Sequence, residues 1–180
     1  LELSLDFGKI VDKYPDIADN VRGYPADGKD CRGITVTLHE YDGNVETFQS
    51  SVDDIWSTRK NAKDDSSILV NGSTQPDNYN HSANEDNPWW SADFGLGQPL
   101  KEILIVNRFD QEGVRDRLFP CEIIVEKENG DKWIKAIGRE MVINKKYIPI
   151  SGIDGLVRKV TISLPGIDRY LSISQVKFFL

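Results

Sequence analysis

The sequence predicts an all-β domain, an antiparallel β-sandwich or barrel, from three observations. Apolar and polar residues alternate at period two in short runs, as at Ile34, Val36 and Leu38, a pattern typical of half-buried strands. Turn signals such as Asn129-Gly130 separate these runs at close spacing. Helical periodicity is scarce, and its best candidate is one short turn around residues 52–56.

The predicted strands follow one another from Arg32 to the end of the chain. After the first run they lie at residues 90–94, 101–107, 120–126, 132–137, 140–144, 157–164 and 172–180. Residues 126–132 are predicted to form a hairpin tip, because an Asn-Gly pair between two strands favours a tight turn. Many short strands at this spacing are typical of antiparallel sandwiches and barrels.

Two segments lack this strand pattern. Residues 1–30 contain Pro15 and Pro25 and have weak periodicity, which indicates an extended arm or an extra strand with loops. Residues 58–88 are polar, with almost no aliphatic residues except those at 68–70. A loop this long in a compact domain is usually functional or held by specific contacts, so it is a natural place for a site.

Length and charge limit the classes of function. A chain of 180 residues corresponds to one domain with a few tens of residues left over. The net charge of −7 argues against a basic surface for nucleic acid or anionic membranes, but it leaves room for a local basic pocket. The longest aliphatic run, residues 103–106, is too short to span a bilayer. We therefore expect no nucleic-acid partner and no membrane insertion.

The chain opens on Leu1 without an apolar leader, which predicts a trimmed or processed chain or a piece of a larger protein. Its two cysteines, Cys31 and Cys121, either pair and close a long loop or remain two separate buried thiols. Two cysteines and two histidines do not make a zinc site. Two glycosylation acceptor patterns begin at Asn71 and Asn80, both in the long polar loop.

A set of polar residues after this loop keeps a specific spacing. His81 is followed after 26 residues by Arg108, with Asp110 two residues on and Arg115 after four more. Between them, residues 88–95 read Pro-Trp-Trp-Ser-Ala-Asp-Phe-Gly. The spacing resembles the sugar-binding signature of F-type lectins (fucolectins), and residues 88–95 resemble their Pro-Trp-Trp-x-x-Asp-Leu-Gly segment. These lectins belong to the discoidin-like, galactose-binding-like β-sandwiches.

The resemblance extends over residues 44–180. The end of the chain, residues 169–179, is similar to the closing strand of the family, and residues 44–51 are a weaker match to its opening. The family implies an antiparallel jelly-roll β-sandwich for residues 44–180. Residues 1–43 are then an N-terminal arm or an extra strand of unassigned role.

The side chains in this pattern suit the chemistry of a sugar. Sugar hydroxyls both donate and accept hydrogen bonds, an arginine fork offers several fixed donors, and a neutral histidine adds a donor or an acceptor. A flat aromatic ring can cover the C–H face of a pyranose. The predicted sugar-binding residues are His81, Arg108, Arg115, Arg117, Asp110, Tyr79 and Phe109. No bond has to change, so the prediction is a binding site and not a catalytic one.

Several of these residues also have a structural interpretation. His81 either contacts the ligand or is a solvated turn residue. Arg108 either binds the ligand, or forms a structural salt bridge with Asp110, or does both. We expect Trp89 and Trp90 to pack in the core and the sheet, as the resemblance implies, and not to stack on a ligand.

Two departures from the family concern the pocket. The second basic residue of the family is commonly followed by leucine; Arg115 keeps the spacing, whereas Arg117 has the Arg-Leu context. In an extended segment residues 115 and 117 point to the same side, so either can reach the pocket. Residues 111–114 are Gln-Glu-Gly-Val in place of the adjacent cysteines that the family often has, which weakens the case for fucose.

A further departure concerns calcium. The family usually holds a Ca²⁺ with an Asp and a Glu, and this sequence has amides in their place, at Asn71 and Gln175. Because Ca²⁺ prefers oxygen ligands that include carboxylates, we predict a weak or absent site and no required cofactor. The amides can instead hydrogen-bond directly and hold the loop without metal. The candidate ligands are Asn71, Ser73, Asn78 and Gln175.

The acceptor patterns bear on the same pocket. A glycan on Asn80 would stand beside His81 and crowd the pocket. Either the acceptor patterns are therefore unused, or the pocket is not a working sugar site.

We therefore predict a non-enzymatic carbohydrate-binding module that recognises fucose or a related sugar on glycans, secreted or on a cell or particle surface. The alternative is a structural or adhesion module of a larger surface assembly, with a degenerate sugar site and other protein subunits as partners. An enzyme is disfavoured because none of the common catalytic motifs occurs. The carboxyl groups of Glu85, Asp86 and Asp110 are more simply solvated loop charges than a glycosidase pair.

Overall fold

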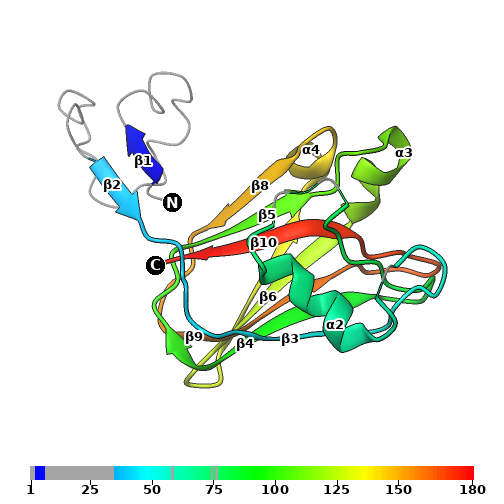
Figure 1. Cartoon of the computed structure of the whole chain (residues 1–180). Helices are drawn as coiled ribbons and strands as arrows, with labels where there is room; N and C mark the ends of the chain where they lie inside the picture. Colours follow the sequence, from blue (N-terminus) through cyan, green and yellow to red (C-terminus); the bar gives the residue numbers. More distant parts are fainter. Residues whose placement is uncertain (1–2, 7–34, 58, 74, 76) are drawn as a thin grey trace. The chain divides into compact units, whose positions relative to one another are not determined.

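The computed structural model describes residues 3–6, 35–57, 59–73, 75 and 77–180. The chain divides into two compact units, Leu1–Glu40 and Tyr41–Leu180. In the first unit, strand β1 (Leu3–Asp6) pairs antiparallel with strand β2 (Thr35–Leu38), as Figure 1 shows. Strand β2 lies within the first predicted run. The role predicted for residues 1–43 stays a prediction.

The second unit consists of two antiparallel sheets that lie as two layers (Figure 1). The larger sheet has the order β3-β4-β9-β6-β7, with strands Glu46–Gln49, Trp89–Gln98, Val157–Ser163, Cys121–Lys127 and Lys132–Ile137. The smaller sheet has the order β10-β5-β8, with strands Ile173–Phe179, Glu102–Asn107 and Tyr147–Ser151. The predicted antiparallel β-sandwich is confirmed.

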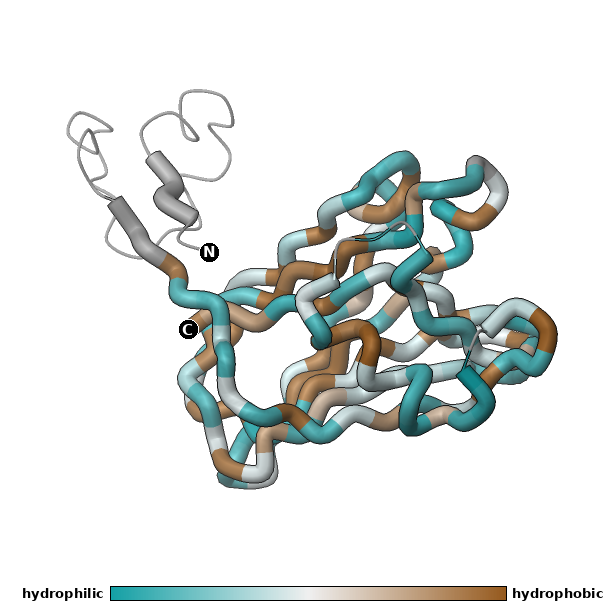
Figure 2. Tube along the Cα trace, viewed as in Figure 1, coloured by the Kyte–Doolittle hydropathy of each residue, from teal (hydrophilic) through white to brown (hydrophobic). Residues whose placement is uncertain are grey.

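The hydrophobic core lies between the two sheets, because alternate residues of a strand point to the same face. In β9, Val160 and Ile162 are fully buried, whereas Thr161 between them is half-buried. Figure 2 shows the apolar positions gathered between the layers. Trp90 of β4 is fully buried, as expected, and its indole Nε1 donates a hydrogen bond to the carbonyl of Ser66 at 2.9 Å.

Most of the predicted strands are present at the predicted places. Strands predicted at 90–94, 101–107, 120–126, 132–137, 157–164 and 172–180 correspond to β4, β5, β6, β7, β9 and β10. The predicted hairpin joins β6 to β7. Gly130 has a φ of +90° at its turn, a conformation that glycine adopts without a steric penalty.

The strand predicted at 140–144 is wrong. The chain forms there the short helix α4 (Arg139–Val142), and the side chain of Val142 is fully buried. The apolar residues at 141–143 are consecutive and do not alternate. Periodicity cannot separate a strand from a helix in such a short run, so packing decided the outcome.

Strand β8 is a strand that the sequence pattern did not predict, because Pro149 stands in its middle. Its neighbours Ile148 and Ile150 are buried in the core, in alternation with exposed residues. Proline is tolerated here because β8 is an edge strand of its sheet. Strand β3 is likewise an edge strand that was matched only as part of the family's opening segment.

The long polar segment predicted as a loop contains two short helical elements. These are α2 (Ala62–Ser67) and the 3₁₀ helix η2 (Ile68–Val70). The side chain of Asn61 caps α2 by accepting a hydrogen bond from the backbone N–H of Asp64 at 2.9 Å. In the described part of the chain, no helix is long and apolar enough to cross a membrane.

Cys121 is a free thiol at the start of β6, and it is buried. Burial raises the pKa of this thiol to about 12, so it is not a nucleophile at neutral pH. Cys31, which the sequence analysis considered as its partner, lies outside the described residues.

Candidate functional site

The segment that carries His81 lies along the beginning of β10, at the end of the three-stranded sheet. The backbone N–H of Asn80 donates to the carbonyl of Ile173 at 3.0 Å, and the N–H of Ser82 donates to the carbonyl of Leu171 at 2.9 Å. Ile173 pairs with the last residue of β5, and Arg108 follows that strand directly. Two distant parts of the sequence, around positions 81 and 108, therefore meet at this end of the sheet.

His81 is almost completely buried, with 2 % of its surface exposed. Its ring Nδ1 lies 2.9 Å from the carbonyl oxygen of Ser82, so Nδ1 carries the proton and Nε2 is the acceptor. Burial lowers the pKa of His81. The hydrogen bond to the Ser82 carbonyl and the charge of Asp53 oppose this effect, and the positive charges of Arg108 and Arg117 add to it. The interpretation of His81 as a solvated turn residue is therefore wrong.

Arg108 is buried and held by three hydrogen bonds. Its Nε and Nη2 donate to the two carboxylate oxygens of Asp110 at 2.8 and 3.0 Å, and its Nη1 donates to the hydroxyl of Ser172 at 3.3 Å. Partial burial opposes ionisation of Asp110, but the hydrogen bonds and charge of Arg108 outweigh it and lower the pKa of Asp110. The predicted salt bridge is present. Since a guanidinium has five N–H donors, it leaves two N–H groups for a ligand.

Tyr79 lies against Arg108. The guanidinium carbon is 3.6 Å from the centroid of the Tyr79 ring, close enough for a cation–π contact. One face of this ring is thus occupied by Arg108. Tyr79 supports the arginine and has at most its other face and its edge for a sugar.

Arg117 and Tyr170 complete the surroundings of His81. The ring of Tyr170 meets the imidazole of His81 edge-on, with centroids 5.5 Å apart, and the guanidinium of Arg117 lies 5.5 Å from the same tyrosine ring. The side chain of Arg169 fixes this part of the backbone by donating to the carbonyl oxygens of Arg117 and Phe119, each at 2.8 Å. Arg117 is therefore on the side of His81.

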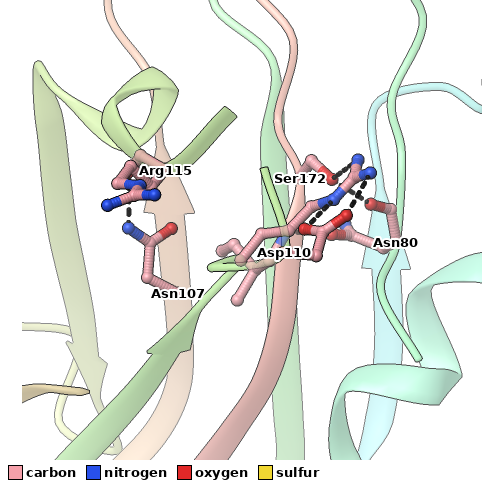
Figure 3. Close-up of polar contacts among 7 residues, drawn as sticks. Asn80, Asn107, Asp110, Arg115 and Ser172 are labelled. Carbon is pink, nitrogen blue, oxygen red and sulfur yellow. Dashed lines mark hydrogen bonds and ion pairs between the residues drawn. The ribbon is translucent and has the colours of Figure 1, made fainter. Parts of the chain in front are cut away.

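Arg115 has a different environment. Its guanidinium lies 4.5 Å from the centroid of Phe109, its Nη1 donates to Asn144 at 3.4 Å, and its carbonyl accepts a 2.6 Å hydrogen bond from Asn107. Figure 3 shows Arg115 beside Asn107, apart from the group formed by Asp110 and its neighbours. Arg115 and Phe109 form a pair of their own.

The expectation that residues 115 and 117 point to the same side is wrong. It assumed an extended segment, but the chain forms helix α3 (Glu112–Arg115) followed by the 3₁₀ helix η3 (Asp116–Leu118). Two residues apart on a helix differ in direction by about 200°. The local helix therefore separates the two arginines that the sequence left as alternatives.

The four candidate calcium ligands lie together and are joined by hydrogen bonds of their amide groups. Asn71 donates from Nδ2 to Oδ1 of Asn78 at 3.1 Å, and Asn78 donates from Nδ2 to the carbonyls of Ile68 and Ser174, each at 3.2 Å. Elsewhere in the group, the backbone N–H of Ser73 donates to Oδ1 of Asn71 at 2.8 Å, and Nε2 of Gln175 donates to the Ser73 carbonyl at 3.3 Å. The backbone carbonyl oxygens of Ile68, Ser73 and Ser174 thus already accept hydrogen bonds from side-chain amides.

These residues do not fit a calcium ion. No carboxylate is among the four, and Ca²⁺ sites rely on carboxylate charge. Among the described residues, no group of three or more His, Cys, Asp or Glu side chains could hold a metal ion. The amide hydrogen bonds link the loop after η2 to β10 directly.

The two glycosylation acceptor patterns differ in accessibility. Asn80 is fully buried, its Nδ2 donates to Gln49 at 3.0 Å, and its Oδ1 accepts from the N–H of Ile173 at 2.8 Å. A glycan cannot be attached to this side chain in the folded protein. Asn71 is exposed, so only this position is open to modification.

Sequence reasoning missed several residues that surround His81 and Arg108. Tyr170 and Ser172 stood in the segment that resembled the closing strand, and that resemblance was the only signal for them. Gln49 stood in the weaker match to the family's opening segment, whereas Asp65 had no signal in the sequence. Their place is set by long-range packing between α2, β3 and the His81 segment.

No protein-family model matches the sequence, and no curated protein matches it. Among solved structures, a fucose-binding module of Streptococcus pneumoniae matches with a TM-score of 0.65 and 23 % identity, over 79 % of this chain and 98 % of that one. An F-lectin (fucolectin) from striped bass serum, Morone saxatilis, matches with a TM-score of 0.56 and 17 % identity, over 81 % of this chain and 50 % of that one. The family 32 CBM from Clostridium perfringens NanJ, in complex with galactose, matches with a TM-score of 0.55 and 12 % identity, over 76 % of this chain and 93 % of that one.

The fold is therefore that of the discoidin-like, galactose-binding-like β-sandwiches. Within this class, the structural neighbours include fucose-binding modules and an F-type lectin. They support the resemblance to F-type lectins that the sequence motifs indicated.

Proposed function

We propose that the chain is a non-enzymatic carbohydrate-binding module that recognises fucose or a related sugar through His81, Arg108 and Arg117. The observation that carries this proposal is that a buried His81 and the buried Arg108, which Asp110 holds in place and which still has two N–H donors, lie at the same end of the smaller sheet. Both groups come from segments that flank the paired ends of β5 and β10. The motif spacing and the fold of the neighbours support it.

The proposed chemistry is complementary hydrogen bonding. The Nε2 of His81 accepts from one sugar hydroxyl, while the remaining N–H groups of Arg108 and those of Arg117 donate to others. The rings of Tyr79 and Tyr170 present apolar surface near these groups. Because all partners except Arg117 are held by other contacts, little side-chain entropy is lost on binding.

Arg117 takes the role for which the spacing favoured Arg115. The guanidinium of Arg117 lies next to Tyr170, whereas that of Arg115 lies next to Phe109, so we use Arg115 as a matched control of the same charge and residue type. We propose further that no calcium is required and that the protein is located outside the cell or on a cell or particle surface, where glycans are its partners.

A glycan array followed by calorimetry with L-fucose and D-galactose tests the proposal. We expect binding by the wild type and at least a roughly tenfold weaker Kd for His81→Ala, Arg108→Lys and Arg117→Ala, since hydrogen bonds to charged groups contribute about 1.5–3 kcal/mol. Arg115→Ala should bind within about twofold of the wild type. A folded wild type that binds no glycan on the array would overturn the proposal.

A structural or adhesion module is the second candidate. It is favoured by the separate compact unit Leu1–Glu40 and by the exposed apolar side chains of Ile55, Trp56 and Ile167, which are 81 %, 65 % and 73 % exposed. Such side chains suit contacts with another protein subunit. Self-association or capture of a defined subunit that is lost in Trp56→Ser, with sugar binding absent, would favour this second function.

A further inference from the structure

A buried acidic residue, Asp65, is hydrogen-bonded to the backbone of His81. Asp65 of α2 has no exposed surface, and within the described residues it has no cationic partner. Its carboxyl group accepts three hydrogen bonds: from Nε2 of Gln49 at 2.9 Å, from Oγ of Ser57 at 2.6 Å, and from the backbone N–H of His81 at 2.8 Å. Burying a carboxyl group away from water is costly unless its oxygens are hydrogen-bonded, and these three donors offset that cost.

The contacts of Asp65 continue to the other side of the site. Gln49, which donates to Asp65, accepts from Nδ2 of Asn80 at 3.0 Å. The carbonyl of Asn80 accepts from Oγ of Ser172 at 2.8 Å, and that hydroxyl accepts from Nη1 of Arg108 at 3.3 Å. Figure 3 shows Asn80, Ser172 and Asp110 close together at one end of this network of hydrogen bonds.

Every member of this chain of hydrogen bonds is buried. The exposed fractions are 0 % for Asp65 and Asn80, 5 % for Ser172, and 6 % for Gln49 and Arg108. Water does not compete for these hydrogen bonds, so each partner has one strongly preferred position. The network therefore joins the two groups assigned to sugar recognition, which come from segments that are far apart in sequence.

His81 itself is held at three points. Its N–H is bound by Asp65, its carbonyl oxygen by the N–H of Asp53 at 2.9 Å, and its ring Nδ1 by the carbonyl of Ser82. Only Nε2 has no partner among the described residues. The three anchors determine both the position and the tautomer of the imidazole, and the anchor supplied by Asp65 comes from a different element, α2.

We propose that Asp65 is a positioning residue of the sugar site: it holds the backbone of His81 directly and steadies Arg108 through Gln49, Asn80 and Ser172. This inference rests on the proposed function. A carboxyl group is suited to the role because both of its oxygens accept, so three donors from β3, the 52–57 turn and the His81 segment converge on it. An apolar residue would leave all three donors unsatisfied in the interior.

Two substitutions and one control test the proposal. Asp65→Ala removes the acceptor. Asp65→Asn keeps an oxygen for Gln49 and His81 and turns its NH₂ toward the hydroxyl of Ser57, which can accept. Asp64→Asn, one residue earlier on α2, makes the same change of charge at an exposed position and serves as the matched control.

The readouts are amide hydrogen exchange of His81, measured by NMR against the amide of Val160 in β9, and calorimetry with L-fucose and D-galactose. We expect exchange at His81 relative to Val160 to rise about tenfold in Asp65→Ala and about threefold in Asp65→Asn, with sugar affinity falling in the same order. Asp64→Asn should match the wild type in both.

The exchange ratio separates positioning from general stability, because loss of overall stability accelerates both amides together. If the ratio and the sugar affinity of every folded Asp65 variant stay within about twofold of Asp64→Asn, the inference is overturned. If Asp65→Ala does not fold, Asp65→Asn alone decides. If the wild type binds neither sugar, the proposed function fails, while the exchange ratio still shows whether Asp65 holds His81.

Discussion

The guanidinium of Arg108 lies 3.6 Å from the centroid of the Tyr79 ring. Together with the two hydrogen bonds to Asp110, this contact holds the arginine by an aromatic ring against the guanidinium and a carboxylate at its edge. The site therefore contains an arginine whose direction is set before any ligand binds, and such pre-organisation strengthens binding by reducing the entropy lost.

The role of Tyr79 can be tested by comparing Tyr79→Ala with Tyr79→Phe. A cation–π contact contributes about 0.5–2 kcal/mol, and phenylalanine keeps the ring that makes it. We expect the Kd for the bound sugar to rise about three- to tenfold in Tyr79→Ala and to change less than about twofold in Tyr79→Phe, as measured by calorimetry. Equal losses in both variants would show instead that the phenolic hydroxyl contacts the sugar.

Acid should destabilise the protein through His81. The pKa of His81 is lowered in the folded chain, chiefly by burial, whereas in the unfolded chain it returns to about 6.5. As the pH falls through about 6.5, the unfolded state therefore binds more protons than the folded state, and the free energy of unfolding decreases. Sugar affinity should fall at still lower pH, when the folded His81 takes up a proton and Nε2 ceases to accept.

Thermal unfolding between about pH 7.5 and pH 5.5 measures this effect, and the two histidines of the chain provide the control. His81→Gln should remove most of the decrease in stability over this range, whereas His39→Gln, at an exposed position, should keep it. A decrease that persists unchanged in His81→Gln would contradict the assignment.

Calcium should have no effect on the wild type. The carbonyls around Asn71 and Gln175 already accept hydrogen bonds from side-chain amides, so an ion would have to displace these donors without gaining a carboxylate. We expect the same melting temperature and the same sugar affinity with added calcium or with EDTA. If calcium raised the melting temperature or the sugar affinity, this would show that the ion displaces the hydrogen bonds of the side-chain amides.

The double substitution Asn71→Asp with Gln175→Glu provides the converse test. It removes two amide donors and introduces two carboxylates near the carbonyls of Ile68 and Ser174. We expect this variant to be less stable than the wild type in EDTA, and we expect calcium to restore part of the loss, because Ca²⁺ binding to the folded state stabilises it by mass action.

Glycosylation should be confined to one position. In a host that attaches N-linked glycans, intact-mass measurement should show at most one glycan, and Asn71→Gln should abolish it. Asn80→Gln should leave the glycan mass unchanged and lower stability, because Asn80 makes buried hydrogen bonds to Gln49 and Ile173. A glycan found on Asn80 in folded protein would contradict the buried position of this side chain.

Most strands could be read from the sequence because their pattern is local. In β9, for example, the alternation of Val160 and Ile162 with polar residues is a property of the strand itself. The exceptions are informative. In β8 a proline is accepted only because the strand lies at a sheet edge, and at 139–142 a short apolar run became a helix because packing selected that conformation.

The sequence by itself determined the class of fold, the loops that bear the candidate site, and the residue types that suit a sugar. Alternation, turn residues and motif spacing are local features of the sequence, so they can be recognised without the tertiary structure. Only the tertiary structure decided that Arg117 and not Arg115 stands on the side of His81, and that Asp65 lies buried behind it. The reason is that these relations join residues of different elements. They depend on the turn of one short helix and on how α2 packs against β3, which no single segment of the sequence contains.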